Sequence, residues 1–100
     1  MNYRIESAEW SKIYGFLTTE KGLHTFDEEN LRRFIEAVWY VARTGCQWRL
    51  LPDYYGHWRG VHRKFKHWCR SGVFSRMMIH FTNANMQAVI PDATIIRANA

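Results

Sequence analysis

The sequence predicts a small, mainly α-helical domain of four helices, followed by a short C-terminal strand. Two observations favour this fold class. Apolar residues recur at the three- and four-residue spacing of one helix face in four successive stretches. In addition, 47% of the 100 residues are hydrophobic, which is enough to fill one core in a chain of this length.

Two helices are expected in the first half of the chain, over residues 8–18 and 26–44. Ser7 is the expected N-cap of the first helix, because its hydroxyl can accept a hydrogen bond from the first turn. Thr25 and Glu28 have the spacing of a capping box at the start of the second helix. Each cap precedes an apolar face, formed by Trp10, Ile13, Tyr14 and Leu17 and then by Leu31, Phe34, Ile35, Val38 and Val41.

The segment 45–56 is predicted to be a loop, because a glycine stands at each end and Pro52 lies inside it. Gly45 is also the expected end of the second helix, since glycine accepts the left-handed backbone conformation found beyond helix ends. The segment is rich in large apolar side chains, namely Trp48, Leu50, Leu51, Tyr54 and Tyr55. We therefore expect this loop to pack on the core.

Two further helices are expected over residues 57–70 and 73–83. The remainder, residues 88–96, is apolar and β-branched around one acid, which is typical of a buried strand. Proline is tolerated in an edge strand or at the first residue of a strand, so Pro91 would lie at one of these positions. No internal repeat or low-complexity tract is apparent.

The helix over residues 57–70 has two opposite faces. At 100° per residue, one stripe of its surface is apolar and consists of Trp58, Val61, Phe65 and Trp68. The nearly opposite stripe is cationic and consists of Arg59, Arg63, Lys66 and Arg70. Neighbouring like charges repel one another unless an anion lies alongside them, and DNA phosphates would relieve this repulsion. A helix-turn-helix recognition helix has this arrangement, although the expected loop before the helix is longer than in that motif.

Arg43 and Arg49 flank this region and are further candidates for DNA contacts, with Arg76 next after them. The net charge of +5 is unevenly distributed, because residues 1–36 carry −2 and residues 37–100 carry +7. A basic block of this kind favours a polyanionic partner. The alternative is a basic surface that only keeps the helix soluble.

Other functional classes have little support in the sequence. The apolar runs are too short for a signal core or a membrane span, so we expect a cytoplasmic, nucleoid-associated protein without a membrane partner. Cys46 and Cys69 have no disulfide or zinc spacing and are expected to be free thiols. His57, His62 and His67 recur every five residues, so on a helix they point in three directions and cannot share a metal ion. His62 and Cys69 are instead expected to pack beside the apolar stripe.

One string is specific enough to indicate a family. Residues 43–52 read RTGCQWRLLP, and they are followed by the spaced set Trp58, Val61, Phe65 and Trp68 and then by Ser71, Gly72, Val73 and Phe74. This pattern resembles the N-terminal part of bacterial insertion-sequence transposases of family five, which are DDE-type enzymes. The match extends upstream through residues 31–38 and downstream to residues 92–98.

The resemblance implies a function for each part of the chain. Residues 1–86 would be a helical domain that binds double-stranded DNA at the terminal inverted repeats of the transposon. Residues 87–100 would be the start of a truncated, RNase H-like catalytic domain, with Asp92 as the first of three catalytic carboxylates. The full-length family uses Mg²⁺ held by all three. Since this chain has no acid after Asp92, we expect it to bind no such cofactor and not to be an enzyme by itself.

Two alternatives to specific recognition of transposon ends remain. The same basic face could bind nucleic acid without sequence preference, or the chain could be an inactive transposase remnant. The resemblance also raises the possibility of a protein partner, either a separately encoded catalytic half or another copy of the chain.

Overall fold

The computed structural model describes residues 4–20 and 27–82. These residues form four α-helices and two short 3₁₀ helices and contain no strand, which confirms the mainly α-helical prediction. In chain order the elements are α1 (Ser7–Leu17), α2 (Glu28–Thr44), η1 (Trp48–Leu50), η2 (Asp53–Tyr55), α3 (Trp58–Ser71) and α4 (Val73–Thr82). The predicted strand over residues 88–96 and the predicted domain boundary after residue 86 lie outside the described residues.

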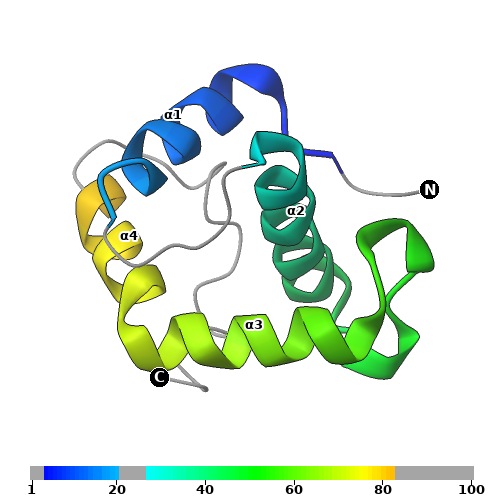
Figure 1. Ribbon diagram of the computed structural model, residues 1–100. Coiled ribbons are helices and arrows are strands. Elements are labelled where there is room, and N and C mark those ends of the chain that lie inside the picture. The colour runs from blue at the N-terminus through cyan, green and yellow to red at the C-terminus, as the bar shows by residue number, and fades with distance from the viewer. Residues whose placement is uncertain (1–3, 21–26, 83–100) are drawn as a thin grey trace.

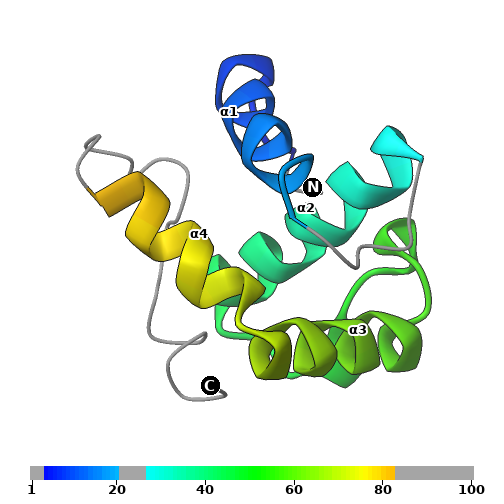
Figure 2. The same cartoon turned by 60° about the vertical axis from the view of Figure 1, so that its left-hand side comes forward.

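The helix α2 lies at the centre of the arrangement, between α1 and α3 (Figure 1). From the end of α3 the chain turns into α4, which runs back toward α1 (Figure 2). The rings of Phe16 in α1 and Phe81 in α4 have centroids 6.1 Å apart, so these two helices also touch. The core lies among the four helices, and its least exposed large side chains include Trp39, Phe65, Phe74, Ile13, Leu17, Ile35 and Met77.

The N-terminal caps of α1 and α2 differ from the predicted ones. Glu6, not Ser7, occupies the N-cap position of α1, because its carbonyl already accepts the helical hydrogen bond from Trp10 N–H at 2.8 Å. In α2 the N-cap is Asp27, whose carboxylate accepts from the N–H groups of Glu29 (3.0 Å) and Asn30 (3.3 Å). A carboxylate at this position also interacts favourably with the helix dipole.

Glycines end α2 and α3 in the left-handed conformation. Gly45 has φ +69° and its N–H donates to the carbonyl of Val41 at 2.8 Å, which confirms the predicted end of α2. Gly72 has φ +84° and is the single residue between α3 and α4. The sharp corner between these two helices therefore depends on a residue without a Cβ.

The connection between α2 and α3 packs on the core, as expected. Leu51 and Tyr55 are buried, and Trp48 is half-buried against α3, with its ring 5.0 Å from that of Phe65. Leu50 and Tyr54, which were expected to pack with them, are instead exposed. In a short 3₁₀ helix neighbouring side chains point in different directions, so only part of this apolar set can face inward.

A buried carboxylate joins the N-terminal segment to α2. The Glu36 side chain is fully buried and accepts hydrogen bonds from the backbone N–H of Ile5 (2.8 Å) and from Nε of Arg32 (3.3 Å). Arg32 also donates to the carbonyl of Ile5, and Nη1 of Arg4 lies 3.9 Å from the Glu36 carboxylate. The segment before α1 is thereby held against α2 by charged groups that were not predicted.

Candidate nucleic-acid interface

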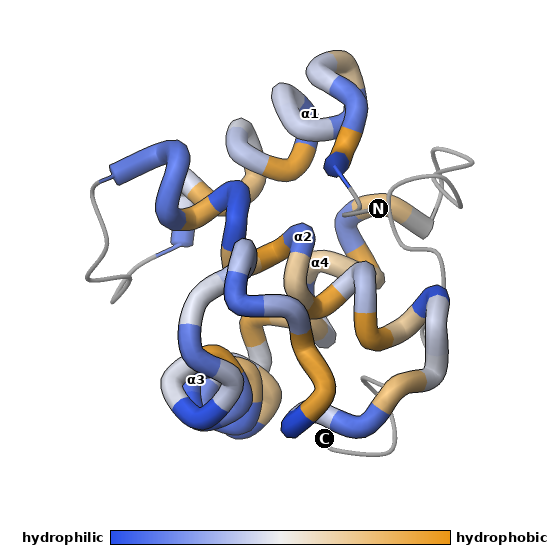
Figure 3. Tube along the Cα trace, turned by 90° about the vertical axis from the view of Figure 1, so that its right-hand side faces the viewer, coloured by the Kyte–Doolittle hydropathy of each residue, from blue (hydrophilic) through white to orange (hydrophobic). Residues whose placement is uncertain are grey.

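The two faces of α3 are oriented as the sequence predicts. Val61, Phe65 and Trp68 are buried against the rest of the molecule, and Trp58 is half-buried. The opposite face carries the predicted cationic residues, which we call the basic stripe: Arg59, Arg63, Lys66 and Arg70. Viewed almost along its axis, α3 turns its hydrophobic residues toward the other helices and its hydrophilic residues outward (Figure 3).

The basic stripe lies on a helix without acidic residues, because α3 contains five Lys and Arg residues and no Asp or Glu. Arg59, Arg63 and Arg70 are exposed, and Lys66 is partly exposed. Among the described residues, neither Arg63 nor Arg70 forms an ion pair, whereas cations on other elements do. Positive charge on this face is therefore available to an external anion.

The 3₁₀ helix η1 packs next to the basic stripe. The Trp48 ring lies 5.2 Å from the ring of His62, which neighbours Lys66 around the axis of α3. Arg49 belongs to the same turn and is exposed. The structure thus brings the turn that carries Arg49 against α3, while Arg43 is exposed in the last turn of α2.

Two residues beside the apolar stripe have perturbed pKa values. Burial, together with the nearby positive charge of Lys66, lowers the pKa of His62. Burial raises the pKa of the Cys69 thiol, and Lys66 opposes this shift. Both side chains pack beside the apolar stripe, as predicted, and both Cys46 and Cys69 are free thiols. Within residues 4–20 and 27–82, no group of three His, Cys, Asp or Glu side chains could hold a metal ion.

Arg76, the remaining candidate, has a structural partner. Its Nη2 lies 2.6 Å from Oε1 of Glu20 and its Nε lies 3.0 Å from the same oxygen. This ion pair joins α4 to the segment after α1. The predicted catalytic residue Asp92 lies outside the described residues.

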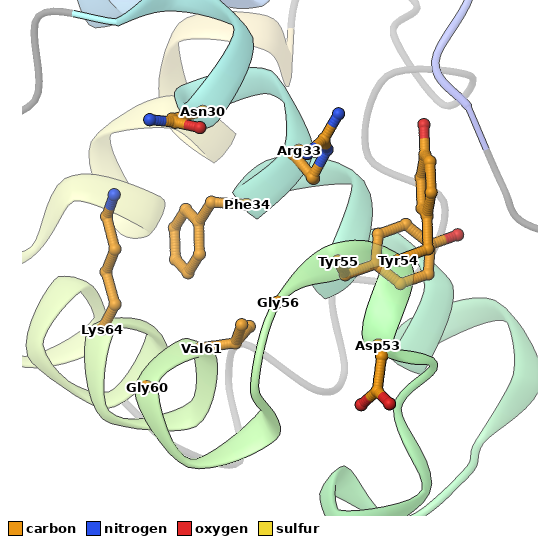
Figure 4. A pocket seen from close by; sticks show the side chains of 10 residues that line it. All are labelled: Asn30, Arg33, Phe34, Asp53, Tyr54, Tyr55, Gly56, Gly60, Val61 and Lys64. Carbon is orange, nitrogen blue, oxygen red and sulfur yellow. The ribbon is translucent and has the colours of Figure 1, made fainter.

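Sequence reasoning missed Lys64, which lies on a different side of α3 from the basic stripe. Its Nζ lies 4.7 Å from the ring centroid of Phe34 and 5.6 Å from that of Trp68. Burial lowers the pKa of this ammonium group. Lys64 lines a pocket of about 300 Å³ between α2, η2 and α3 (Figure 4). Nothing in the sequence pattern predicted this pocket, because its walls come from three separate segments.

The fold and this surface define a small helical module that presents one acid-free cationic helix to solvent. Residues 5–78, which include α1, α2, α3 and the first part of α4, match the family described as "Putative transposase of IS4/5 family (DUF4096)". The chain belongs to this family. This finding supports the resemblance to insertion-sequence transposases at the level of the combined family.

A relative from Sinorhizobium fredii (strain NBRC 101917 / NGR234) is 32% identical over 92 residues. The alignment covers 91% of this chain and 74% of the relative, whose name is "Uncharacterized protein y4sN". No solved structure matches the chain. None of the described helices has both the length and the apolarity needed to cross a membrane.

Proposed function

We propose that this chain is the DNA-binding part of an insertion-sequence transposase of family five and recognises the terminal inverted repeats of its element. The observation that carries the proposal is the basic stripe of α3, which is exposed and lies on a helix without any acidic residue. Membership of the transposase family supplies the biological context, since such a protein must find the ends of its element.

The dimensions of α3 suit the major groove of DNA. With its side chains an α-helix is about 10–12 Å across, which matches the width of the groove, roughly 12 Å. The 14 residues of α3 extend over about 21 Å, so several of its turns can lie along the groove. The buried stripe of α3 packs against α2 and α4, so the basic stripe can approach a duplex without rearrangement of the core. Phosphate contacts by its arginines and lysine would position the helix, and guanine edges are the bases that arginine reads best.

The proposed DNA-binding arrangement differs from a standard helix-turn-helix in the segment that connects α2 to α3. Residues 45–57 separate α2 from α3 and contain η1 and η2 instead of a tight turn. Arg49 is exposed in η1, and η1 packs against α3 through Trp48, so this longer connection would add a phosphate contact near the basic stripe.

A competition experiment separates end recognition from nonspecific binding. Labelled duplex with the inverted repeat that flanks the gene is bound to the protein, and excess unlabelled duplex of unrelated sequence is added. We expect the complex to survive, because specific sites are typically bound about 10³-fold or more tightly than unrelated DNA. Equal competition by unrelated duplex or by RNA would instead establish a nonspecific nucleic-acid-binding protein.

A further inference from the structure

The pocket between α2, η2 and α3 is separate from the basic stripe. Around the axis of α3, Lys64 is between about 100° and 160° away from each residue of the stripe, at 100° per residue. The pocket is lined on the α3 side by Gly60, Val61 and Lys64 and on the α2 side by Asn30, Arg33 and Phe34. A duplex lying along the basic stripe would therefore not fill it.

Two cationic side chains reach this pocket from different helices. Lys64 of α3 and Arg33 of α2 stand on either side of Phe34, with the Asn30 amide beside them (Figure 4). Nε of Arg33 is buried and has no hydrogen-bond partner, although Nη2 lies 3.9 Å from the carboxylate of Glu29. About 40% of the Arg33 side chain is nevertheless exposed, so its positive charge contributes to the potential in the pocket.

The rest of the pocket offers flat and apolar surfaces. Its lining includes the aromatic rings of Phe34, Tyr54 and Tyr55, and the Arg33 guanidinium lies 5.1 Å from the ring centroid of Tyr54. A Cβ added to Gly60 would meet no atom within 4 Å, so a ligand can approach the backbone there. One carboxylate, that of Asp53, belongs to the lining. Phe34 and Tyr55 are themselves buried, so Tyr54, which is 38% exposed, is the ring that a ligand can cover. Cations beside such a ring suit a ligand that is both anionic and planar.

We propose that this pocket binds one nucleotide unit, with its phosphate at the Lys64 ammonium and the Asn30 amide and its base toward Tyr54. The volume of about 300 Å³ is at the lower end of the range for small-molecule sites, which suits a mononucleotide rather than a longer ligand. The unit could be a free nucleoside monophosphate or one nucleotide of a single strand. The proposal does not depend on recognition of inverted repeats, because it uses a different side of α3.

The test is a nuclear magnetic resonance titration of the full chain labelled with ¹⁵N, using adenosine monophosphate as the probe. The amides of Gly56 and Gly60 line the pocket and should shift with a saturable dependence on concentration, while the amide of Gly45 at the end of α2 should not. Inorganic phosphate and adenosine alone should each bind at least about tenfold more weakly, since each provides only half of the contacts. No duplex is present, so this result is independent of recognition of transposon ends.

A parallel titration with a single-stranded oligonucleotide identifies the source of the nucleotide. Shifts of Gly56 and Gly60 with both probes would assign the pocket to a strand as well as to free nucleotide, and shifts with adenosine monophosphate alone would assign it to free nucleotide. Either result supports the proposal. Shifts confined to the amides of the basic stripe would overturn it, as would the absence of saturation or binding of phosphate as tight as that of the nucleotide.

Substitutions test the proposed role of the cations. Lys64→Met keeps a long side chain over Phe34 and Trp68 but removes the charge, and we expect binding to weaken by about tenfold or more. The matched control is Arg63→Gln, which removes a neighbouring charge from the basic stripe and should change affinity by less than about twofold. Equal effects of the two substitutions would contradict the proposal.

A second variant tests the proposal independently, in case Lys64→Met does not fold. Gly60→Leu adds a side chain where an added Cβ meets no atom within 4 Å, and leucine favours a helix more than glycine does. We expect this variant to remain folded by circular dichroism and to lose nucleotide binding by filling the pocket. A folded Gly60→Leu protein with unchanged affinity would overturn the proposal.

Discussion

Glu36 is the one charged residue that is buried among the described residues, and its environment explains how a small core tolerates it. Removing a carboxylate from water is costly unless charged and hydrogen-bonding partners replace the water. Here Arg32, which is also largely buried at 12% exposure of its side chain, and the N–H of Ile5 supply those partners at Oε2. Oε1 has no hydrogen-bond partner, and its nearest cation is Nη1 of Arg4 at 3.9 Å. The resulting cluster positions the segment that leads into α1.

Glu36→Gln should lower the free energy of unfolding by about 3 kcal/mol, because it leaves the partly buried Arg32 without its countercharge. Arg4 should add little to this loss, since its side chain is 49% exposed and its interaction with Glu36 is screened by water. Urea denaturation measures the change. The control is Glu28→Gln in the exposed first turn of the same helix, which should cost less than about 1 kcal/mol. Similar losses for both variants would refute the role given to the buried cluster.

His62 should make the stability of the domain dependent on pH. Its pKa in the folded protein is lowered by burial and by Lys66, so the unfolded chain takes up the proton first. The free energy of unfolding should therefore fall as the pH decreases through the usual histidine pKa of 6.5, and the loss should be complete below the folded pKa. His62→Phe retains a ring against Trp48 but cannot titrate. Between pH 8 and pH 5.5, thermal denaturation should show a smaller decrease in stability for this variant than for the unsubstituted protein. An equal decrease in both proteins would show that His62 is not the source of the pH dependence.

Among the elements, α3 was the most predictable from sequence and α2 showed the clearest error. Apolar periodicity placed all four helices correctly and separated the buried and basic faces of α3, because burial on a helix follows directly from its 3.6-residue repeat. The caps depend on local backbone geometry, so Asp27 could not be distinguished from its neighbours by residue type alone. Lys64 could not be assigned either, since its position depends on the Phe34 ring of another helix.

The corner between α3 and α4 should be sensitive to any side chain at Gly72. Gly72→Ala should destabilise the domain by about 1–2 kcal/mol, because φ of +84° is unfavourable for alanine and its Cβ would lie 2.9 Å from Nη1 of Arg76. The matched control is Gly15→Ala in α1, where an added Cβ meets no atom within 4 Å. This control should increase stability by about 0.5–1 kcal/mol. If the denaturation midpoints of Gly72→Ala and Gly15→Ala moved in the same direction, the left-handed conformation of Gly72 would not be what the corner requires.

The sequence predicted the individual helices better than the contacts between residues that are far apart in the chain. The ion pair of Arg76 with Glu20 spans 56 residues, and the bond from Ile5 to Glu36 spans 31. Such pairs follow from how the helices pack and have no periodic signature in the chain. For the same reason the basic stripe, which lies on one helix, could be predicted, whereas the pocket beside Lys64 could not.

If the basic stripe of α3 binds DNA phosphates, the affinity for inverted-repeat duplex must fall steeply with salt, because each neutralised phosphate releases condensed counterion. Four phosphate contacts predict a slope of log affinity against log salt of about −3.6, and Lys66→Ala should make the slope shallower by about 0.9. Lys12→Ala, at an exposed position of α1, is the control and should leave the slope unchanged. Alanine at all four stripe positions should leave the protein folded and abolish most of the affinity and the slope. A folded quadruple variant with unchanged affinity and slope would show that α3 is not the DNA-binding surface and would make Arg43 and Arg49 the next residues to substitute.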